Sequence, residues 1–77
     1  MAASGFGGRL RELRLARRLT QVQLAERAGM HPQAVVKLER GEREPLWPSV
    51  LALAEALGVT VLAFTDRPRK RKRRGDR

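Results

Sequence analysis

Apolar residues recur at helical spacing along this chain, and a glycine follows most of the helical segments. Phe6, Leu10 and Leu13 share one face of a helix expected over residues 6–18. Three later segments each end at a glycine, the residue that most readily takes the left-handed conformation closing a helix: Gly29, Gly41 and Gly58. The expected fold is therefore all-α, a compact bundle of four to five short helices.

The strongest start signal precedes the second helix. Thr20 and Gln23 match a capping box, in which the Thr20 hydroxyl accepts from the Gln23 amide and the Gln23 side chain reaches back. Leu19 and Leu24 flank the box as a hydrophobic staple. This helix is expected to begin after Thr20 and to end at Gly29.

Only three residues separate the second helix from a third, which is expected to begin at Pro32 after an unusual N-cap, His31. Val35 and Leu38 point inward. The opposite face gathers a mainly polar and basic set at helical spacing: Gln33, Val36, Lys37 and Arg40. Two short helices joined by such a turn, the second with a polar outer face, describe a helix-turn-helix.

An amphipathic stripe predicts a fourth helix that starts at about residues 46–48 and ends at Gly58. The stripe, expected to face the core, comprises Trp47, Val50, Leu51, Ala54 and Leu57. Residues 59–65 have strand-like composition, but a lone strand would have no partner. We therefore expect a short fifth helix that packs Val61 and Phe64 on the core.

Charge is the other strong feature of the composition. The 77 residues carry 17 Lys and Arg against 8 Asp and Glu, a net charge of +9, and residues 67–77 hold eight basic and one acidic side chains. Such a polycation favours nucleic acid or anionic lipid, although a tail that only aids solubility is the alternative. We expect residues 1–5 to be flexible, 6–66 to form the folded domain and 67–77 to be a disordered basic tail.

Several classes of function are disfavoured. The chain has no cysteine for disulfides or thiolate chemistry, and no apolar run near the ~20 residues of a membrane span. Without a signal peptide, it is expected in the cytoplasm, associated with the nucleoid. No nucleophile has a plausible base, and there is one histidine, so we expect no enzyme and no cofactor, metal or small-molecule ligand.

Three segments in order resemble the lambda-repressor/Cro-type (XRE) helix-turn-helix family, over roughly residues 6–65. They are residues 20–29 (Thr-Gln-Val-Gln-Leu-Ala-Glu-Arg-Ala-Gly), 35–45 (Val-x-x-Leu-Glu-Arg-Gly-x-Arg-x-Pro) and 51–59 (Leu-x-Leu-Ala-x-Ala-Leu-Gly-Val). The resemblance implies a prokaryotic or phage transcriptional regulator. Such a protein binds double-stranded DNA as a homodimer at a pseudo-palindromic operator.

An outward helix face of this kind fits the major groove of DNA. We expect Gln33 to pair with adenine, Lys37 to donate to guanine and Val36 to contact a thymine methyl. The alternative is a plain solvated face, but an exposed β-branched apolar residue argues against it. Pro32 departs from the family pattern and removes a side chain that often reads a base there.

The resemblance also implies contacts with the DNA backbone at the start of the second helix and around the third, by Thr20, Gln21, His31, Arg40 and Arg43. It pairs Arg14 with Glu39 in an internal salt bridge, for which two unrelated exposed charges are the alternative. The tail is expected to add sequence-independent affinity for phosphates through Arg69, Lys70, Arg71, Lys72, Arg73 and Arg74.

Other readings stay open at this point. Leu15 and Leu62 stand at usually polar family positions, either as scattered exposed leucines or as part of a dimer surface. A repressor, a restriction-modification controller and an antitoxin are not distinguished, and neither is a protein-interaction module on the same fold. RNA binding is disfavoured because the aromatic residues are all expected on apolar faces: Phe6, Trp47 and Phe64.

Overall fold

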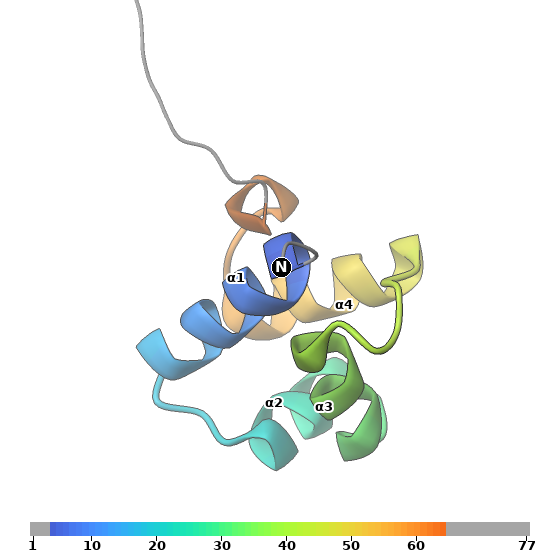
Figure 1. Ribbon diagram of the computed structural model, residues 1–77. Helices are drawn as coiled ribbons and strands as arrows, with labels where there is room; N and C mark the ends of the chain where they lie inside the picture. The colour runs from blue at the N-terminus through green and yellow to red at the C-terminus, as the bar shows by residue number, and fades with distance from the viewer. Residues whose placement is uncertain (1–3, 65–77) are drawn as a thin grey trace, which may run out of the picture.

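The computed structural model describes residues 4–64, which form a small all-α bundle without a strand (Figure 1). The elements are α1 (Ser4–Ala16), α2 (Gln21–Ala28), α3 (Pro32–Arg40), α4 (Trp47–Leu57) and a 3-10 helix, η1 (Val61–Phe64). The expected fold class is thereby confirmed. The predicted basic tail, 67–77, and residues 1–3 of the predicted flexible N-terminus lie outside the described residues.

In Figure 1, α2 and α3 lie together at one end of the bundle, and η1 lies at the other. Helix α1 packs on α3, α4 packs on α2, and η1 contacts both α1 and α4. The helix pair that matches the helix-turn-helix pattern is therefore braced from behind by α1 and α4. No helix within residues 4–64 is long and apolar enough to cross a lipid bilayer.

Most helix ends follow local signals in the sequence. The predicted capping box is present: Gln23 N donates to Thr20 Oγ1 at 3.0 Å, and Thr20 N donates to Gln23 Oε1 at 2.9 Å. His31 caps α3, because its Nδ1 accepts from the Gln33 amide at 3.1 Å. Gly29, which ends α2, has a φ of 71°, where glycine avoids the strain of a Cβ.

The first helix begins and ends two residues earlier than predicted, at Ser4 and Ala16. It ends early because Arg18 takes a left-handed φ of 58°. The Leu19 amide then donates back to Arg14 O at 3.2 Å, a closing bond that resembles a glycine-terminated helix end. No glycine marks this position, so the sequence carried no signal for it.

The apolar core is continuous across all the helices. Its largest fully buried side chains come from α1, α2, α3 and α4: Leu10, Leu24, Val35 and Leu53. Phe6 and Phe64 close the end of the bundle, with ring centroids 4.9 Å apart. The short fifth helical element expected there is present as η1, with Phe64 buried and Val61 packed against the core.

The prediction for the inward face of α4 is wrong at two positions. Trp47 is 61% exposed and Leu51 is 43% exposed, whereas Leu53, outside the predicted stripe, is fully buried. The α4 residues that pack in or against the core are Val50, Leu53, Ala54, Ala56 and Leu57. This set has the same helical period as the predicted one and shares three members with it, so only the packing angle of α4 decides between them. RNA binding was disfavoured because all three aromatic residues were expected on apolar faces, and the exposed Trp47 does not fit that expectation.

Two arginines, one in α1 and one in the turn directly after it, hold the backbone ends of other elements. Arg9 Nε donates to Ala63 O at 2.7 Å, and Arg17 Nε donates to Leu57 O at 2.8 Å. Carbonyls at helix ends lack intrahelical partners, so these bonds satisfy groups that would otherwise need water. Part of the positive charge of α1 is therefore committed to the fold.

A glycine sets the close approach of α1 to α3. A Cβ on Gly7 would lie 2.5 Å from Leu38 O and 2.7 Å from Glu39 O. Real side chains do not tolerate such distances from backbone atoms, so only glycine permits this crossing. The contact fixes the depth at which α1 sits behind α3, and it brings Arg14 within reach of Glu39.

Candidate nucleic-acid interface

The turn between α2 and α3 holds the two helices at a fixed tilt. Residues 29–31 make the turn, and Met30 N donates to Ala25 O at 2.9 Å, which closes α2. The buried side chains that the two helices contribute to the common core are Leu24, Ala25, Val35 and Leu38. With one face of α3 anchored in this way, its opposite face has a defined orientation.

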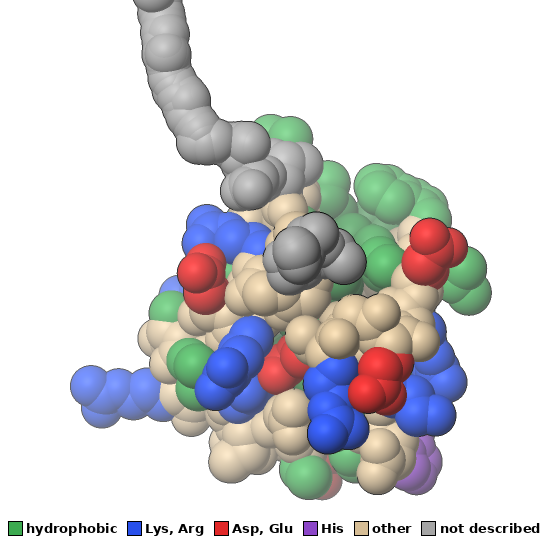
Figure 2. Space-filling model, in the orientation of Figure 1, with side chains coloured by type: hydrophobic (Ala, Val, Ile, Leu, Met, Phe, Trp, Pro, Cys, Tyr) green, Lys and Arg blue, Asp and Glu red, His purple; other side chains and the backbone are tan. Residues whose placement is uncertain are grey.

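That opposite face of α3 lies on the surface. Gln33, Lys37 and Arg40 are exposed, and Val36 is half-buried. Their spacing places them along one edge of the helix, so the structure brings together all the side chains expected to read bases. The space-filling view shows basic side chains spread over the α1–α3 side of the molecule and hydrophobic ones gathered at the start of α4 (Figure 2).

The N-terminal ends of α2 and α3 present donors. Thr20 Oγ1 accepts from Gln23 within the capping box, and the Thr20 hydroxyl hydrogen remains available as a donor. His31 Nδ1 accepts from Gln33 N, so Nε2 is the ring nitrogen left to face a partner outside the protein. Both side chains are exposed, so each can donate to an anionic oxygen next to a helix N-terminus.

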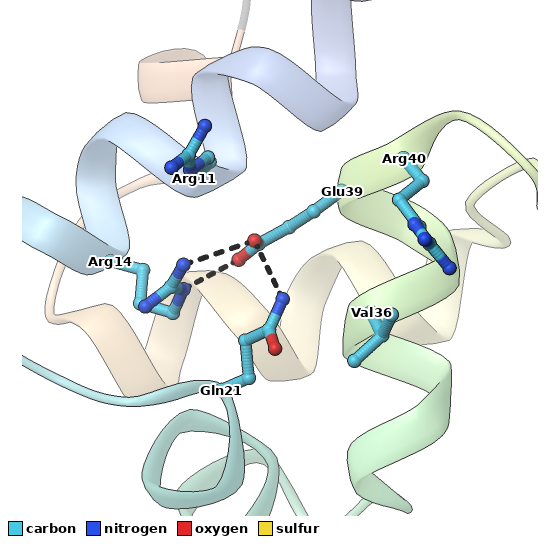
Figure 3. Close-up of a pocket in the computed structure, with 6 residues that line it drawn as sticks. All are labelled: Arg11, Arg14, Gln21, Val36, Glu39 and Arg40. Atoms are coloured by element: carbon cyan, nitrogen blue, oxygen red, sulfur yellow. Dashed lines mark hydrogen bonds and ion pairs between the residues drawn. The ribbon is translucent and has the colours of Figure 1, made fainter.

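Glu39 is the meeting point of three helices (Figure 3). Its Oε2 lies 2.6 Å from Arg14 Nε, and its Oε1 accepts from Arg14 Nη2 at 3.2 Å and from Gln21 Nε2 at 3.1 Å. Arg14 also donates to Leu19 O at 2.9 Å through Nη1. The salt bridge thus joins α1, the start of α2 and the outer part of α3, with the two side chains only 10% and 4% exposed.

An open hollow of about 520 Å³ surrounds this ion pair (Figure 3). It is lined by Arg11, Arg14, Gln21, Val36, Glu39 and Arg40. Of the expected interface residues, the hollow brings together Gln21, Val36 and Arg40. Arg11 was not identified from the sequence as an interface residue, and the one signal for it is its position, three residues before Arg14 on α1.

Arg43 lies apart from this group. It lines a second hollow of about 360 Å³ whose walls include Phe6, Gly7 and Leu38. Arg40 Nη1 lies 3.7 Å from Glu42 Oε2, but both side chains are more than half exposed, and an ion pair of this kind contributes little. Arg40 can therefore turn toward another anion at small cost.

Residues 4–64 contain no group of three or more His, Cys, Asp or Glu side chains that could hold a metal ion. The chemistry available at the α2–α3 face is hydrogen bonding and charge.

Comparisons with known proteins agree with this geometry. The sequence profile of the helix-turn-helix domain family matches residues 6–63. The immunity repressor protein of Bacillus phage phi105 is 40% identical over 58 residues, which are 75% of this chain and 40% of that protein. The HTH-type transcriptional regulator y4dJ of Sinorhizobium fredii is 39% identical over 54 residues, 70% of each chain. The chain therefore spans less than half of the phage repressor but most of y4dJ.

Solved structures share the fold. The restriction-modification controller protein C.AhdI of Aeromonas hydrophila is 38% identical, with a TM-score of 0.80, over 82% of this chain and 96% of that one. The clp gene regulator ClgR of Corynebacterium glutamicum is 28% identical, with a TM-score of 0.77, over 83% of this chain and 68% of that one. The profile match covers most of the chain, and the chain belongs to the helix-turn-helix domain family, in the lambda-repressor/Cro-type form that its sequence resembles.

Proposed function

We propose that this protein binds double-stranded DNA sequence-specifically and regulates transcription from a pseudo-palindromic operator. The observation that carries the proposal is the anchored α3, whose buried residues Val35 and Leu38 oppose an exposed Gln33 and Lys37. An α-helix held in this way fits the major groove with its outward side chains at the base edges. Binding to DNA, not catalysis, is the activity, and it locates the protein on the nucleoid in the cytoplasm.

Base recognition is assigned to three residues of α3. Gln33 can make a bidentate pair with adenine, and Lys37 can donate to guanine. Val36 lies at the edge of this set, half-buried, where it can contact a thymine methyl. Backbone contacts are assigned to exposed or half-buried polar side chains around them: Thr20, Gln21, His31, Arg40 and Arg43.

The deciding experiment is selection of bound duplexes from a random pool, followed by a double substitution, Gln33→Ala with Lys37→Ala. Each good side-chain pair is worth roughly 1–3 kcal/mol of discrimination, so the double variant should no longer prefer the selected duplex over a scrambled one. Both side chains are exposed, so the unfolding temperature should hardly change.

Arg27→Ala is the matched control, because Arg27 is exposed at the far end of α2 from Gln21. It should leave the preference for the selected duplex intact. If the double variant chooses the same operator as the parent protein, α3 does not read bases, and the alternative of a protein-interaction module or antitoxin on this fold is favoured.

We also propose that the protein acts as a homodimer, which would present two α3 helices about 34 Å apart on one face of the DNA. The support is a group of large apolar side chains exposed around the start of α4, Leu46, Trp47 and Leu51. In a two-fold symmetric dimer the same patch of each copy packs against the other, so one contact removes both patches from water. Leu15 and Leu62, the other candidate contacts, are also exposed but lie on α1 and η1.

A further inference from the structure

The strongest unassigned feature is the charge balance of the hollow between α1, α2 and α3. Its one acid, Glu39, is 4% exposed and is held by Arg14 through two nitrogens. These two charges offset each other below the surface. Arg11 and Arg40 remain, both exposed, so the hollow presents a net positive charge to solvent.

Gln21 gives this hollow a defined hydrogen-bonding polarity. An ionised carboxylate only accepts, so the side-chain atom of Gln21 that faces Glu39 is the amide nitrogen. That nitrogen carries two hydrogens, and Glu39 takes one of them. The second hydrogen is available to another acceptor, as are the first-turn backbone amides of α2 that precede Gln23, whose own amide donates to Thr20 Oγ1.

The two exposed cations, Arg11 and Arg40, lie on opposite sides of the Gln21–Glu39 contact. Figure 3 shows Arg11 above α1 on one side and Arg40 on α3 on the other, with Gln21 between and below them. Arg11 makes no hydrogen bond or ion pair with any other residue in 4–64, and Arg40 has only the long, exposed contact with Glu42. A central donor flanked by two exposed guanidinium groups matches a ligand with several anionic oxygens in a row.

We propose that this hollow seats the sugar-phosphate backbone of one DNA strand, and that Arg11 of α1 is one of its direct phosphate contacts. Gln21 donates to a phosphate oxygen between the two arginines, and Arg40 holds the phosphate on the α3 side. Glu39 acts as a positioning residue, because it fixes which end of the Gln21 amide faces the strand. The proposal rests on the DNA binding proposed above and extends the interface from the helix-turn-helix to α1.

The test replaces one charge at a time and measures how the dissociation constant for the selected duplex depends on salt. Each neutralised phosphate contributes about 0.9 to the slope of log K against log[salt]. Arg11→Gln should therefore flatten the slope by up to about 0.9. Arg27→Gln removes the same charge from an exposed site outside the hollow and should leave the slope nearly unchanged.

A scan of the duplex then locates the contact. Uncharged methylphosphonates are placed at one backbone position after another, and each duplex is titrated with the parent protein, Arg11→Gln and Arg40→Gln. Where the methylphosphonate removes the charge that an arginine contacts, the variant lacking that arginine should bind the duplex as tightly as the parent protein does. The positions found in this way for Arg11→Gln and Arg40→Gln should lie no more than two nucleotides apart on the same strand.

The proposal is overturned if Arg11→Gln keeps the parent slope, or if its loss maps to the other strand or to a distant phosphate. In either case, the double substitution of Gln33 and Lys37 still reports separately on base recognition by α3. A result that contradicts the phosphate contact of Arg11 can therefore be distinguished from one that contradicts DNA binding by the protein.

Discussion

Helices α3 and α4 bury one face each in the same core, yet their outer surfaces are opposite in kind. The exposed side of α3 carries Gln33, Lys37 and Arg40, whereas the exposed side of α4 begins with Trp47 and continues to Leu51. Their starts differ too. α3 begins with a side-chain cap from His31, and α4 begins without one.

The difference indicates two kinds of partner for one small bundle. A polar and basic helix edge is suited to the base edges and phosphates of DNA, which offer acceptors and negative charge. An apolar patch gains nothing from such a partner and gains most from exclusion of water by another apolar surface. Since the loop between α3 and α4 is short, residues 41–46, the two surfaces are held close in space by the same core.

The largest effect is expected at the buried ion pair that holds α3 against α1. Glu39→Ala leaves the Arg14 guanidinium buried without its carboxylate, which should lower the free energy of unfolding by about 3–5 kcal/mol. Urea denaturation followed by circular dichroism measures the loss. Glu26→Ala, an exposed acid on α2, should change stability by less than about 0.5 kcal/mol.

Equal stability of Glu39→Ala and the parent protein would mean that the ion pair does not support the scaffold. The orientation of α3 relative to α1 would then have to rest on the apolar core and the close contact at Gly7 alone.

Removing the predicted tail separates general attraction for DNA from recognition by α3. If the tail engages about four phosphates, a chain ending at Asp66 should show a slope of log K against log[salt] that is flatter by about 3–4. The ratio of affinities for the selected and a scrambled duplex should stay nearly the same, because the α3 face is unchanged. A slope equal to that of the full chain contradicts this role for the tail.

The apolar side of the comparison is tested by Trp47→Ser. If Trp47 is an anchor of the dimer, its loss should weaken self-association by about 2 kcal/mol, roughly 30-fold, measured by sedimentation equilibrium. The unfolding temperature of the monomer should hardly change, since the side chain is 61% exposed. Leu15→Ser, at the alternative candidate contact on α1, where the side chain is 52% exposed, is the comparison.

If Leu15→Ser dissociates the dimer and Trp47→Ser does not, the contact lies on the α1 side of the molecule. A parent protein that is monomeric at all concentrations, with and without DNA, would instead remove the dimer from the proposal.

Much of the fold was predictable because its signals are local. The capping box at Thr20 and the closing glycine at Gly29 act within one helical turn, and the structure has both. The end of α1 and the inward face of α4 were not predictable, because each depends on packing against residues that are distant in the sequence. Arg18 takes a left-handed conformation at a position where the sequence has no glycine. On α4, two sets of apolar residues fit the helical period equally well.

The candidate site divides in the same way. The outward face of α3 follows from its inward one, so Gln33 and Lys37 could be placed from spacing alone. The role of Gly7 could not, because nothing in the sequence reports that α1 crosses α3 within contact of Leu38 O. Arg11 was missed for the same reason: its place in the hollow depends on that crossing.

The smallest effect sharpens the contrast between the starts of α3 and α4. His31→Ala removes the acceptor for Gln33 N, so the free energy of unfolding should fall by about 1 kcal/mol, the usual cost of losing an N-cap. His31→Ser restores an acceptor at the same position and should recover most of that stability. Thermal denaturation of the three proteins measures both changes. If alanine and serine give the same stability, the imidazole does not act as a cap, and the start of α3 is held by Pro32 and the core in the way that α4 is held by Pro48 and its own buried residues.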